Sequence, residues 1–260
     1  MQTVSAGGIR LAFEDVGSGS PAVVLIHGAF ADRSLFAPQI DHLAARHRVI
    51  ALDLRGHGAS EVPASGFGFA DFVGDTLAVC DAAGLDRAVV CGHSVLGAGI
   101  GLELASARPD LVAGVAMLDA SIPYPEPLRQ VQLDTFVPLL EGEGRRTALR
   151  EFIARISAQD APEVQTKVVA AVERAPAPMA APLMRAIFSE DLGPSLSAGH
   201  YPLLHVHAFA PFEVARLREL RPDVLLGSVI GSGHYLTLSA TAQVNAMLDR
   251  FLEIVAWSRS

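Results

Sequence analysis

Short apolar runs alternate with amphipathic stretches through the first half of the chain. Residues 21–28 (PAVVLIHG) and 48–56 (RVIALDLRG) each contain an uninterrupted apolar run and end in glycine, a pattern typical of strands buried on both faces. Between them, apolar residues recur at helical spacing over 35–44. This succession of strand, helix and strand predicts parallel strands joined by crossover helices.

The same alternation extends to the other elements that we expect in the sheet. Further strands are predicted at 87–92, 112–121, 201–209 and 223–234, and further helices at 72–80, 95–108 and 240–256. The predicted fold is therefore α/β, with a mostly parallel twisted sheet covered by helices on both faces.

The pattern changes after Ser121. Three of the five residues from Pro123 to Pro127 are prolines, which excludes an interior strand there. Residues 128–190 show short helical periods broken by proline and glycine, without a strand signal. We therefore predict a helical insertion over 122–200 between two parts of one sheet-based core, 1–121 and 201–260.

Composition narrows the classes of partner. Half of the 260 residues are hydrophobic and 18% are charged, with a net charge of −8. Nucleic acid or an anionic membrane surface would require a basic patch, so a small hydrophobic molecule is the expected partner; the oligomeric state is left open. No secretory signal is recognisable and no apolar run reaches the about 18 residues of a membrane span, so a cytoplasmic location is expected. Cys80 and Cys91 are interpreted as buried hydrophobic residues.

A candidate nucleophile lies where a predicted strand meets a helix. The stretch VVCGHSVLGAG, which begins at Val89, matches the G-x-S-x-G turn through Ser94 but has Leu96 in place of the last glycine. Such a sharp turn projects the serine hydroxyl beyond the sheet, beside unpaired helix amides. Its packing ordinarily leaves no room for a side chain two residues later. We expect the glycines that follow to let the helix start approach the sheet and accommodate the leucine: Gly97, Gly99 and Gly101.

Two further strand ends supply a candidate base and a candidate oxyanion hole. His234 follows the last predicted strand in GSGHYL. The carboxyl ends of parallel strands lie at one edge of the sheet, so His234 is expected at the same edge as Ser94. The segment HGAF follows another strand, so the backbone N–H groups of Ala29 and Val95 are candidate oxyanion donors. His27 is expected to hydrogen-bond within its own loop.

Four segments, in this order and at this spacing, resemble the α/β-hydrolase superfamily: VVLIHGAF, VIALDLRGHGAS, VVCGHS and GSGHYLTL. The resemblance covers the chain except the predicted insertion, which occupies the place of that family's cap. It implies a serine nucleophile, the chain order serine, acid, histidine, and a substrate pocket between cap and sheet.

The acid has two candidates. In most such hydrolases it follows the strand after the cap, but this chain reads FAPFEVARL there, with Pro211 near the expected position and only Glu213 close by. Some branches of the superfamily carry the acid before the cap, among them certain haloalkane dehalogenases, lactonases and cofactor-free quinolone dioxygenases. The matching residue is Asp119, which can equally be structural. We favour Asp119 and keep Glu213 as the alternative.

Other polar and aromatic residues receive plainer interpretations. Asp53, Arg55 and His57 are expected to brace the loops around the oxyanion region. His205 and His207 share one face of a strand, but no carboxylate stands beside them at ligand spacing, so no metal site is predicted. The candidate pocket residues are Phe30, Tyr124, Phe136, Phe152, Met179, Met184, Phe188 and Tyr235.

These features predict a cofactor-free serine hydrolase that cleaves a carboxylic ester or lactone through an acyl-enzyme intermediate. A serine at the turn argues against haloalkane dehalogenase and epoxide hydrolase chemistry, which in this family needs a carboxylate nucleophile. Two alternatives use the same pocket: a cofactor-free dioxygenase or lyase that relies on the histidine and aspartate, and a non-enzymatic ligand sensor, which Leu96 would favour by tilting the turn.

Overall fold

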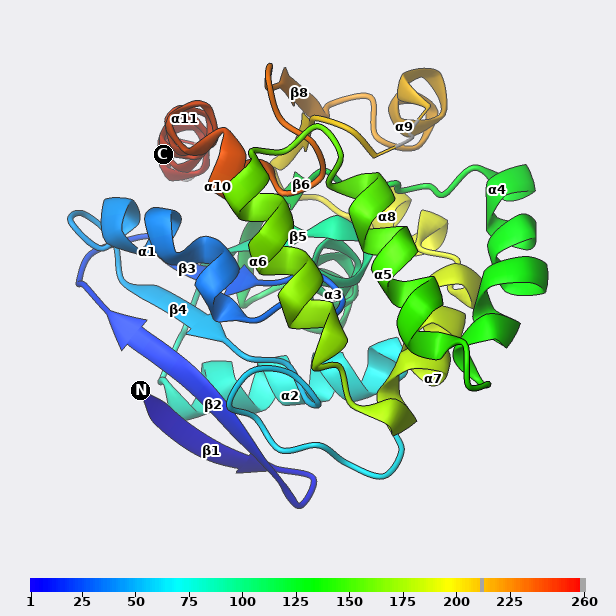
Figure 1. Cartoon of the computed structure of the whole chain (residues 1–260). Coiled ribbons are helices and arrows are strands. Elements are labelled where there is room, and N and C mark those ends of the chain that lie inside the picture. The colour runs from blue at the N-terminus through cyan, green and yellow to red at the C-terminus, as the bar shows by residue number, and fades with distance from the viewer. Residues whose placement is uncertain (211–212, 258–260) are drawn as a thin grey trace.

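The computed structural model describes residues 1–210 and 213–257, and within these ranges the chain forms one sheet between layers of helices (Figure 1). Strand β2 pairs antiparallel with β1 and β4, and the strands from β4 to β8 run parallel. The mostly parallel sheet predicted from the hydrophobic pattern is confirmed. In order across the sheet the strands are β1 (Gln2–Ala6), β2 (Ile9–Val16), β4 (Val49–Leu52), β3 (Ala22–Ile26), β5 (Ala88–His93), β6 (Val112–Leu118), β7 (Leu203–His207) and β8 (Leu225–Ser228).

The hairpin of β1 and β2 was not predicted from the sequence. Most of β1 is exposed or half-buried, so it lacks the buried apolar run by which the inner strands were recognised. Strand β2 joins the sheet by pairing with β4, where Phe13 lies opposite Leu52. The hairpin thus extends the sheet at the edge farthest from β8.

Helices cover both faces of the sheet. The first face carries α1 (Ala37–Leu43) and α11 (Thr241–Trp257), and the second carries α2 (Phe69–Ala82) and α3 (Ser94–Ala107). Successive residues of β6 show the two faces, since strand side chains alternate. A Cβ placed on Gly114 would lie 2.9 Å from a methyl group of Val255 in α11. The next residue, Val115, lies 3.4 Å from the Cβ position of Gly101 in α3.

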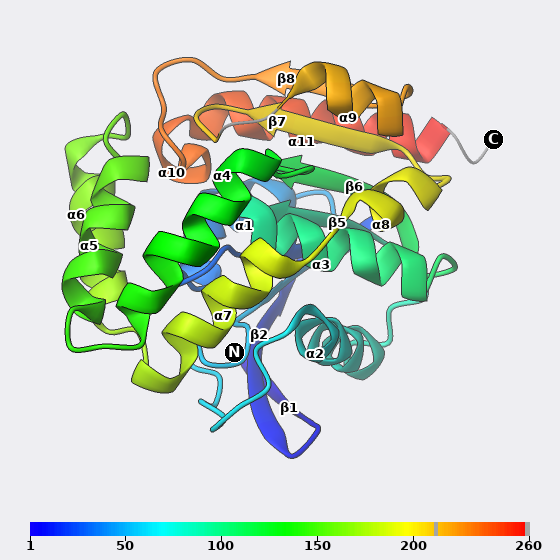
Figure 2. The ribbon, with the colours of Figure 1, turned by 90° about the vertical axis from the view of Figure 1, so that its right-hand side faces the viewer.

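Residues 122–200, here called the helical segment, lie between β6 and β7 and contain helices but no strand in the described chain. Figure 2 shows α4, α7 and α8 in front of the sheet and the α5–α6 pair at its side. Short helical turns, Gln132–Phe136 and Val137–Leu140, connect α4 to α5. The α-helices are α4 (Glu126–Val131), α5 (Arg145–Ile156), α6 (Pro162–Glu173), α7 (Ala177–Ser189) and α8 (Gly193–Ala198).

The carboxyl ends of four neighbouring parallel strands meet at one edge of the sheet. The residues that follow them are His27 after β3, Ser94 after β5, Asp119 after β6 and Ala208 after β7. The remaining helices are the turn Arg33–Phe36, α9 (Val214–Leu220) and α10 (Leu236–Ser239). None of the helices in the described ranges has the length and apolarity to cross a membrane.

Candidate active site

Ser94 occupies a strained turn between β5 and α3. Its φ is +61°, whereas His93 before it is still extended, with φ −94° and ψ 138°. A non-glycine residue in this region costs on the order of 1–3 kcal/mol and persists only where the surrounding packing holds it. The helix starts at Ser94 itself, so the amide of Val95 lies in the first turn and has no acceptor within the helix. The turn has the geometry that the G-x-S-x-G pattern implies.

The turn accommodates Leu96 because the closest approach of α3 to the sheet is at the next residue, Gly97. The leucine is buried in the hydrophobic core. A Cβ placed on Gly97 would lie 2.3 Å from the carbonyl oxygen of Ile26 in β3, a distance that no side chain can occupy. Helix α3 therefore approaches the sheet through Gly97, in line with the expectation that glycines beyond the leucine let the helix start sit close.

His234 and Asp119 form a hydrogen-bonded pair at the same edge. His234 Nδ1 lies 2.8 Å from Asp119 Oδ2, and both side chains are nearly inaccessible, at 8% and 1% exposure. Asp119, directly after β6, has a positive φ of +47°. Because Nδ1 donates to the carboxylate, Nε2 of the neutral imidazole is free to accept a proton. Ser94, Asp119 and His234 line one cavity.

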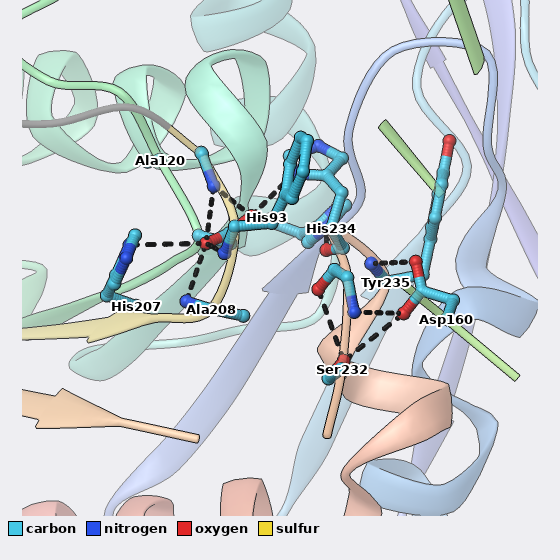
Figure 3. Close-up of polar contacts among 12 residues, drawn as sticks. His93, Ala120, Asp160, His207, Ala208, Ser232, His234 and Tyr235 are labelled. Carbon is cyan, nitrogen blue, oxygen red and sulfur yellow. Dashed lines mark hydrogen bonds and ion pairs between the residues drawn. The ribbon is translucent and has the colours of Figure 1, made fainter. Parts of the chain in front are cut away.

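The loop after β7 holds the Asp119 carboxylate through backbone amides. Ala208 and Phe209 donate to Oδ1 at 2.7 and 2.8 Å, and Ala210 donates to both oxygens, at 3.1 and 2.9 Å. Nδ1 of His207 lies 3.6 Å from Oδ1 (Figure 3). Burial alone would raise the pKa of Asp119, but the hydrogen bond and charge of His234 and the amides outweigh it and lower this pKa to about 2. Asp119 is therefore ionised at neutral pH.

Glu213, the alternative acid, lies apart from this pair. It is exposed, directly precedes α9 and lines a neighbouring hollow of about 390 Å³, which shares Val95 and Ser121 with the cavity of Ser94. Neither His234 nor Ser94 contributes to the lining of that hollow. Pro211, at the position where the family pattern expects the acid, lies outside the described residues.

The loop after β3 lies beside Ser94. A Cβ placed on Gly28 would lie 3.0 Å from Cβ of Ser94. The amide of Phe30 donates to Nε2 of His57 at 3.1 Å, whereas within the described chain no acceptor takes the amide of Ala29. The candidate oxyanion donor Ala29 thus keeps its N–H available at the cavity wall.

Of the residues predicted to brace this region, His57 and Asp53 bind at or next to this loop, whereas the side chain of Arg55 pairs with Asp75 in α2. His27 donates from Nδ1 to the carbonyl of Gly28 (2.7 Å) and accepts at Nε2 from Leu54 N–H (3.1 Å). Burial lowers the pKa of His27 to about 4 and that of His57 to about 3, so both rings are neutral, as these bonds require. Asp53 accepts the amide of Arg33 at 2.9 Å.

A family model described as the α/β hydrolase fold matches residues 21–168, more than half of the chain. The chain belongs to this family. It is 35% identical over 123 residues to 2-(acetamidomethylene)succinate hydrolase of Mesorhizobium japonicum, covering 47% of this chain and 43% of that protein. Over 105 residues it is 35% identical to a 2-heptyl-3-hydroxy-4-quinolone dioxygenase of Rhodococcus erythropolis, covering 39% and 38%. The matches thus span less than half the length of these relatives.

The whole described fold has counterparts among solved structures. A thermophilic esterase from Thermogutta terrifontis superposes with a TM-score of 0.86 at 24% identity, covering 98% of this chain and 99% of that one. At this level of identity the likeness shows a shared fold. The α/β-hydrolase architecture predicted from four motifs is therefore confirmed.

The cavity of this α/β-hydrolase has a volume of about 320 Å³ and lies between the sheet edge and the helical segment. The predicted residues that line it are Phe30, Tyr124, Phe152, Met184, Phe188 and Tyr235. Phe136 and Met179 do not line it. Phe136 stacks on Phe152, with ring centroids 4.7 Å apart, and Met179 packs near Gly56. The helical spacing of apolar residues thus identified most of the pocket residues, but it did not distinguish Phe152, which lines the cavity, from Phe136, which packs against Phe152.

Sequence reasoning missed several polar residues around the site. Ser121, Gln132 and Arg155 also line the cavity. Asp160, in the helical segment, accepts hydrogen bonds from both sides of His234. No motif marks these positions, because their partners are distant in sequence. His205 and His207 have parallel rings 6.4 Å apart, and within the described residues no group of three metal-ligating side chains is found.

Proposed function

We propose that this α/β-hydrolase is a serine hydrolase that cleaves a carboxylic ester or lactone of a small hydrophobic substrate. The observation that carries the proposal is the convergence of three groups on one cavity: Ser94 in a strained turn, and the hydrogen-bonded pair His234 and Asp119. A serine hydroxyl is a weak nucleophile without a base, and the base needs an oriented tautomer. The support for these roles is the His234–Asp119 hydrogen bond and the place of Ser94 on the same cavity.

In the proposed reaction, Ser94 Oγ attacks the substrate carbonyl carbon while Nε2 of His234 accepts its proton. Asp119, which stays ionised, stabilises the imidazolium through Nδ1. The oxyanion of the tetrahedral intermediate accepts hydrogen bonds from the amides of Ala29 and Val95. Its collapse breaks the ester C–O bond, and the alkoxide leaves with the proton from His234. Water then repeats these steps on the acyl-enzyme, releases the acid and restores Ser94.

The shape and lining of the cavity support a small hydrophobic substrate. Its volume of about 320 Å³ lies at the lower end of the about 300–1,000 Å³ typical of small-molecule sites. The acyl side would contact apolar groups of the helical segment, among them Phe152, Met184 and Phe188. We therefore propose that residues 122–200 act as a cap over a core formed by 1–121 and 201–260.

Replacing the nucleophile tests the proposal. Ser94→Ala removes the attacking oxygen, so turnover of p-nitrophenyl esters should fall roughly 10⁶-fold, as loss of a nucleophile does elsewhere. A fluorophosphonate probe should label the unmodified protein and not this variant. Ser121→Ala is the matched control, because Ser121 lines the same cavity outside the strained turn; it should still be labelled. A folded Ser94→Ala protein with unchanged turnover contradicts the proposal.

A second candidate function uses the same pair without the serine nucleophile. Its support is the acid before the helical segment, together with the partial match to a quinolone dioxygenase. In this reaction His234 would remove the proton of a ring hydroxyl, and the resulting anion would react with O₂. Oxygen uptake with a 3-hydroxyquinolone that survives Ser94→Ala but not His234→Ala would favour it. Loss of all activity in Ser94→Ala would reject it.

A further inference from the structure

The link between α5 and α6 lies against the loop that carries His234. Asp160 lies on this link, in the helical segment, and Ser232, His234 and Tyr235 lie on the loop between β8 and α10 (Figure 3). The contacts join residues 72 to 75 positions apart in the chain. The candidate base therefore sits at a junction between the sheet core and the helical segment.

Asp160 binds both neighbours of His234. Its Oδ1 accepts the amide of Gly233 at 2.9 Å and the hydroxyl of Ser232 at 3.2 Å. Its Oδ2 accepts the amide of Tyr235 at 3.1 Å. The amide of His234 itself donates to the carbonyl of Ile156, at the end of α5, at 3.2 Å. Three consecutive amides around the base thus donate to the helical segment.

The backbone of His234 is held from its other side by the serine turn. Nε2 of His93, the residue before Ser94, lies 2.8 Å from the carbonyl oxygen of His234. Burial lowers the pKa of His93 to about 3, so its ring is neutral, and Nε2 donates to this carbonyl. The amide of His234 is thus fixed by the helical segment, its carbonyl by the serine turn and its ring by Asp119.

The approach of Asp160 to this loop is close and shielded from water. Asp160 is 4% exposed, and no cation is paired with it in the described part of the chain. A Cβ placed on Gly233 would lie 2.6 Å from Asp160 Oδ2, so only glycine permits the contact. A buried carboxylate is costly unless donors satisfy it. Here the amides and hydroxyl of the His234 loop provide those donors.

We propose that Asp160 is a positioning residue, through which the helical segment sets the place of the His234 ring relative to Ser94. The inference rests on the proposed hydrolase function. Proton transfer depends on correct placement of the base, and a displacement of about 1 Å can cost about 100-fold in rate. Removing Asp160 frees the amides on both sides of His234 while leaving the ring, Asp119 and Ser94 intact.

The test separates positioning from simple docking of the helical segment. In Asp160→Asn the side-chain NH₂ must face at least one amide donor, which loosens the loop. We expect kcat for a p-nitrophenyl ester to fall about 10- to 100-fold, with KM within about threefold because Asp160 does not line the cavity. Ser232→Ala, which removes only one of the hydrogen bonds to Asp160, should show a smaller fall and serves if Asp160→Asn does not fold.

Ser239→Ala is the matched control. Ser239 Oγ accepts the amide of Ala161 at 3.3 Å, so this variant severs the next contact between the helical segment and the core without touching the His234 loop. It should change kcat by less than about twofold, since it displaces no reacting group. Equal losses of kcat in Asp160→Asn and Ser239→Ala, or an unchanged kcat in folded Asp160→Asn and Ser232→Ala, would overturn the proposal.

Amide hydrogen exchange provides a measurement that needs no turnover. In Asp160→Asn the amides of Gly233 and Tyr235 should exchange at least about tenfold faster, whereas those of Ala208 and Phe209, which hold Asp119, should not change. If the unmodified protein hydrolyses no ester, the proposed function fails while the exchange rates still report whether Asp160 holds the loop. If ester hydrolysis is present and the exchange rates do not change, only the positioning role fails.

Discussion

The ends of β6 and β7 are neighbours in the sheet and contribute different groups to the site. Asp119 directly follows strand β6 and supplies the carboxylate beside His234. Strand β7 ends at a loop whose amides, from Ala208 to Ala210, donate to that same carboxylate. In most members of the superfamily the second strand end is the one expected to carry the acid.

This comparison shows that the acid and the hydrogen-bond donors that hold it can come from two different strand ends. The imidazole needs an anionic oxygen next to Nδ1, and the buried anion needs hydrogen-bond donors. Here one strand end provides the charge and the other provides the donors. Neighbouring parallel strands end at the same edge, so the carboxylate can come from either one and still reach the histidine.

The largest effect is expected from removing the charge at the β6 end. Asp119→Asn preserves volume, but its amide cannot hold the imidazole in the tautomer that accepts a proton at Nε2. We expect kcat for ester hydrolysis to fall about 10⁴-fold, as an equivalent change does in serine proteases. A loss of less than about tenfold in a folded variant would mean that Asp119 has a structural role alone.

An intermediate effect is expected on stability at low pH. The pKa of Asp119 falls from 3.8 to about 2 on folding, so the folded state favours the ionised form. Its contribution, about 2 kcal/mol, is fully present above about pH 4 and is lost as the pH falls through about 2. Between pH 5 and pH 2 the free energy of urea unfolding should fall by about 2 kcal/mol more in the unmodified protein than in Asp119→Asn, because the other carboxylates with lowered pKa titrate in both proteins. An equal pH dependence in both proteins would contradict the burial and hydrogen bonding described above.

The smallest effect is expected at the β7 side. Glu213→Gln removes the exposed carboxylate that lies beyond the loop of amides. Because this residue lines a different hollow from Ser94, we expect kcat to stay within about twofold and urea stability within about 0.5 kcal/mol. This variant also serves as the control for loss of one negative charge. A large fall in kcat here, with little change in Asp119→Asn, would reverse the assignment of the acid.

Residues at strand ends were the most predictable part of the site. Ser94 and Asp119 were identified because each follows a buried apolar strand, and His234 because it lies in the glycine-flanked loop after the last strand. Parallel strands bring such positions to one edge of the sheet. The β1–β2 hairpin escaped prediction because its first strand is largely exposed. Pocket residues on the helices were predicted less well. Phe136 and Phe152 are both apolar residues in stretches predicted to be helical, yet only Phe152 lines the cavity.

The sequence by itself determined the α/β order of the elements and the strand ends that hold the candidate reacting groups, because burial periodicity and turn chemistry are local properties. Only the tertiary structure decided which carboxylate is hydrogen-bonded to His234, how Leu96 is accommodated, and that Asp160 binds the backbone on both sides of His234. These outcomes depend on contacts between distant segments, such as Gly97 with Ile26 and Asp160 with Gly233. Hydrogen bonds form only when donor and acceptor lie about 3 Å apart. The packing of the sheet, its helices and the helical segment therefore decides which of these bonds form.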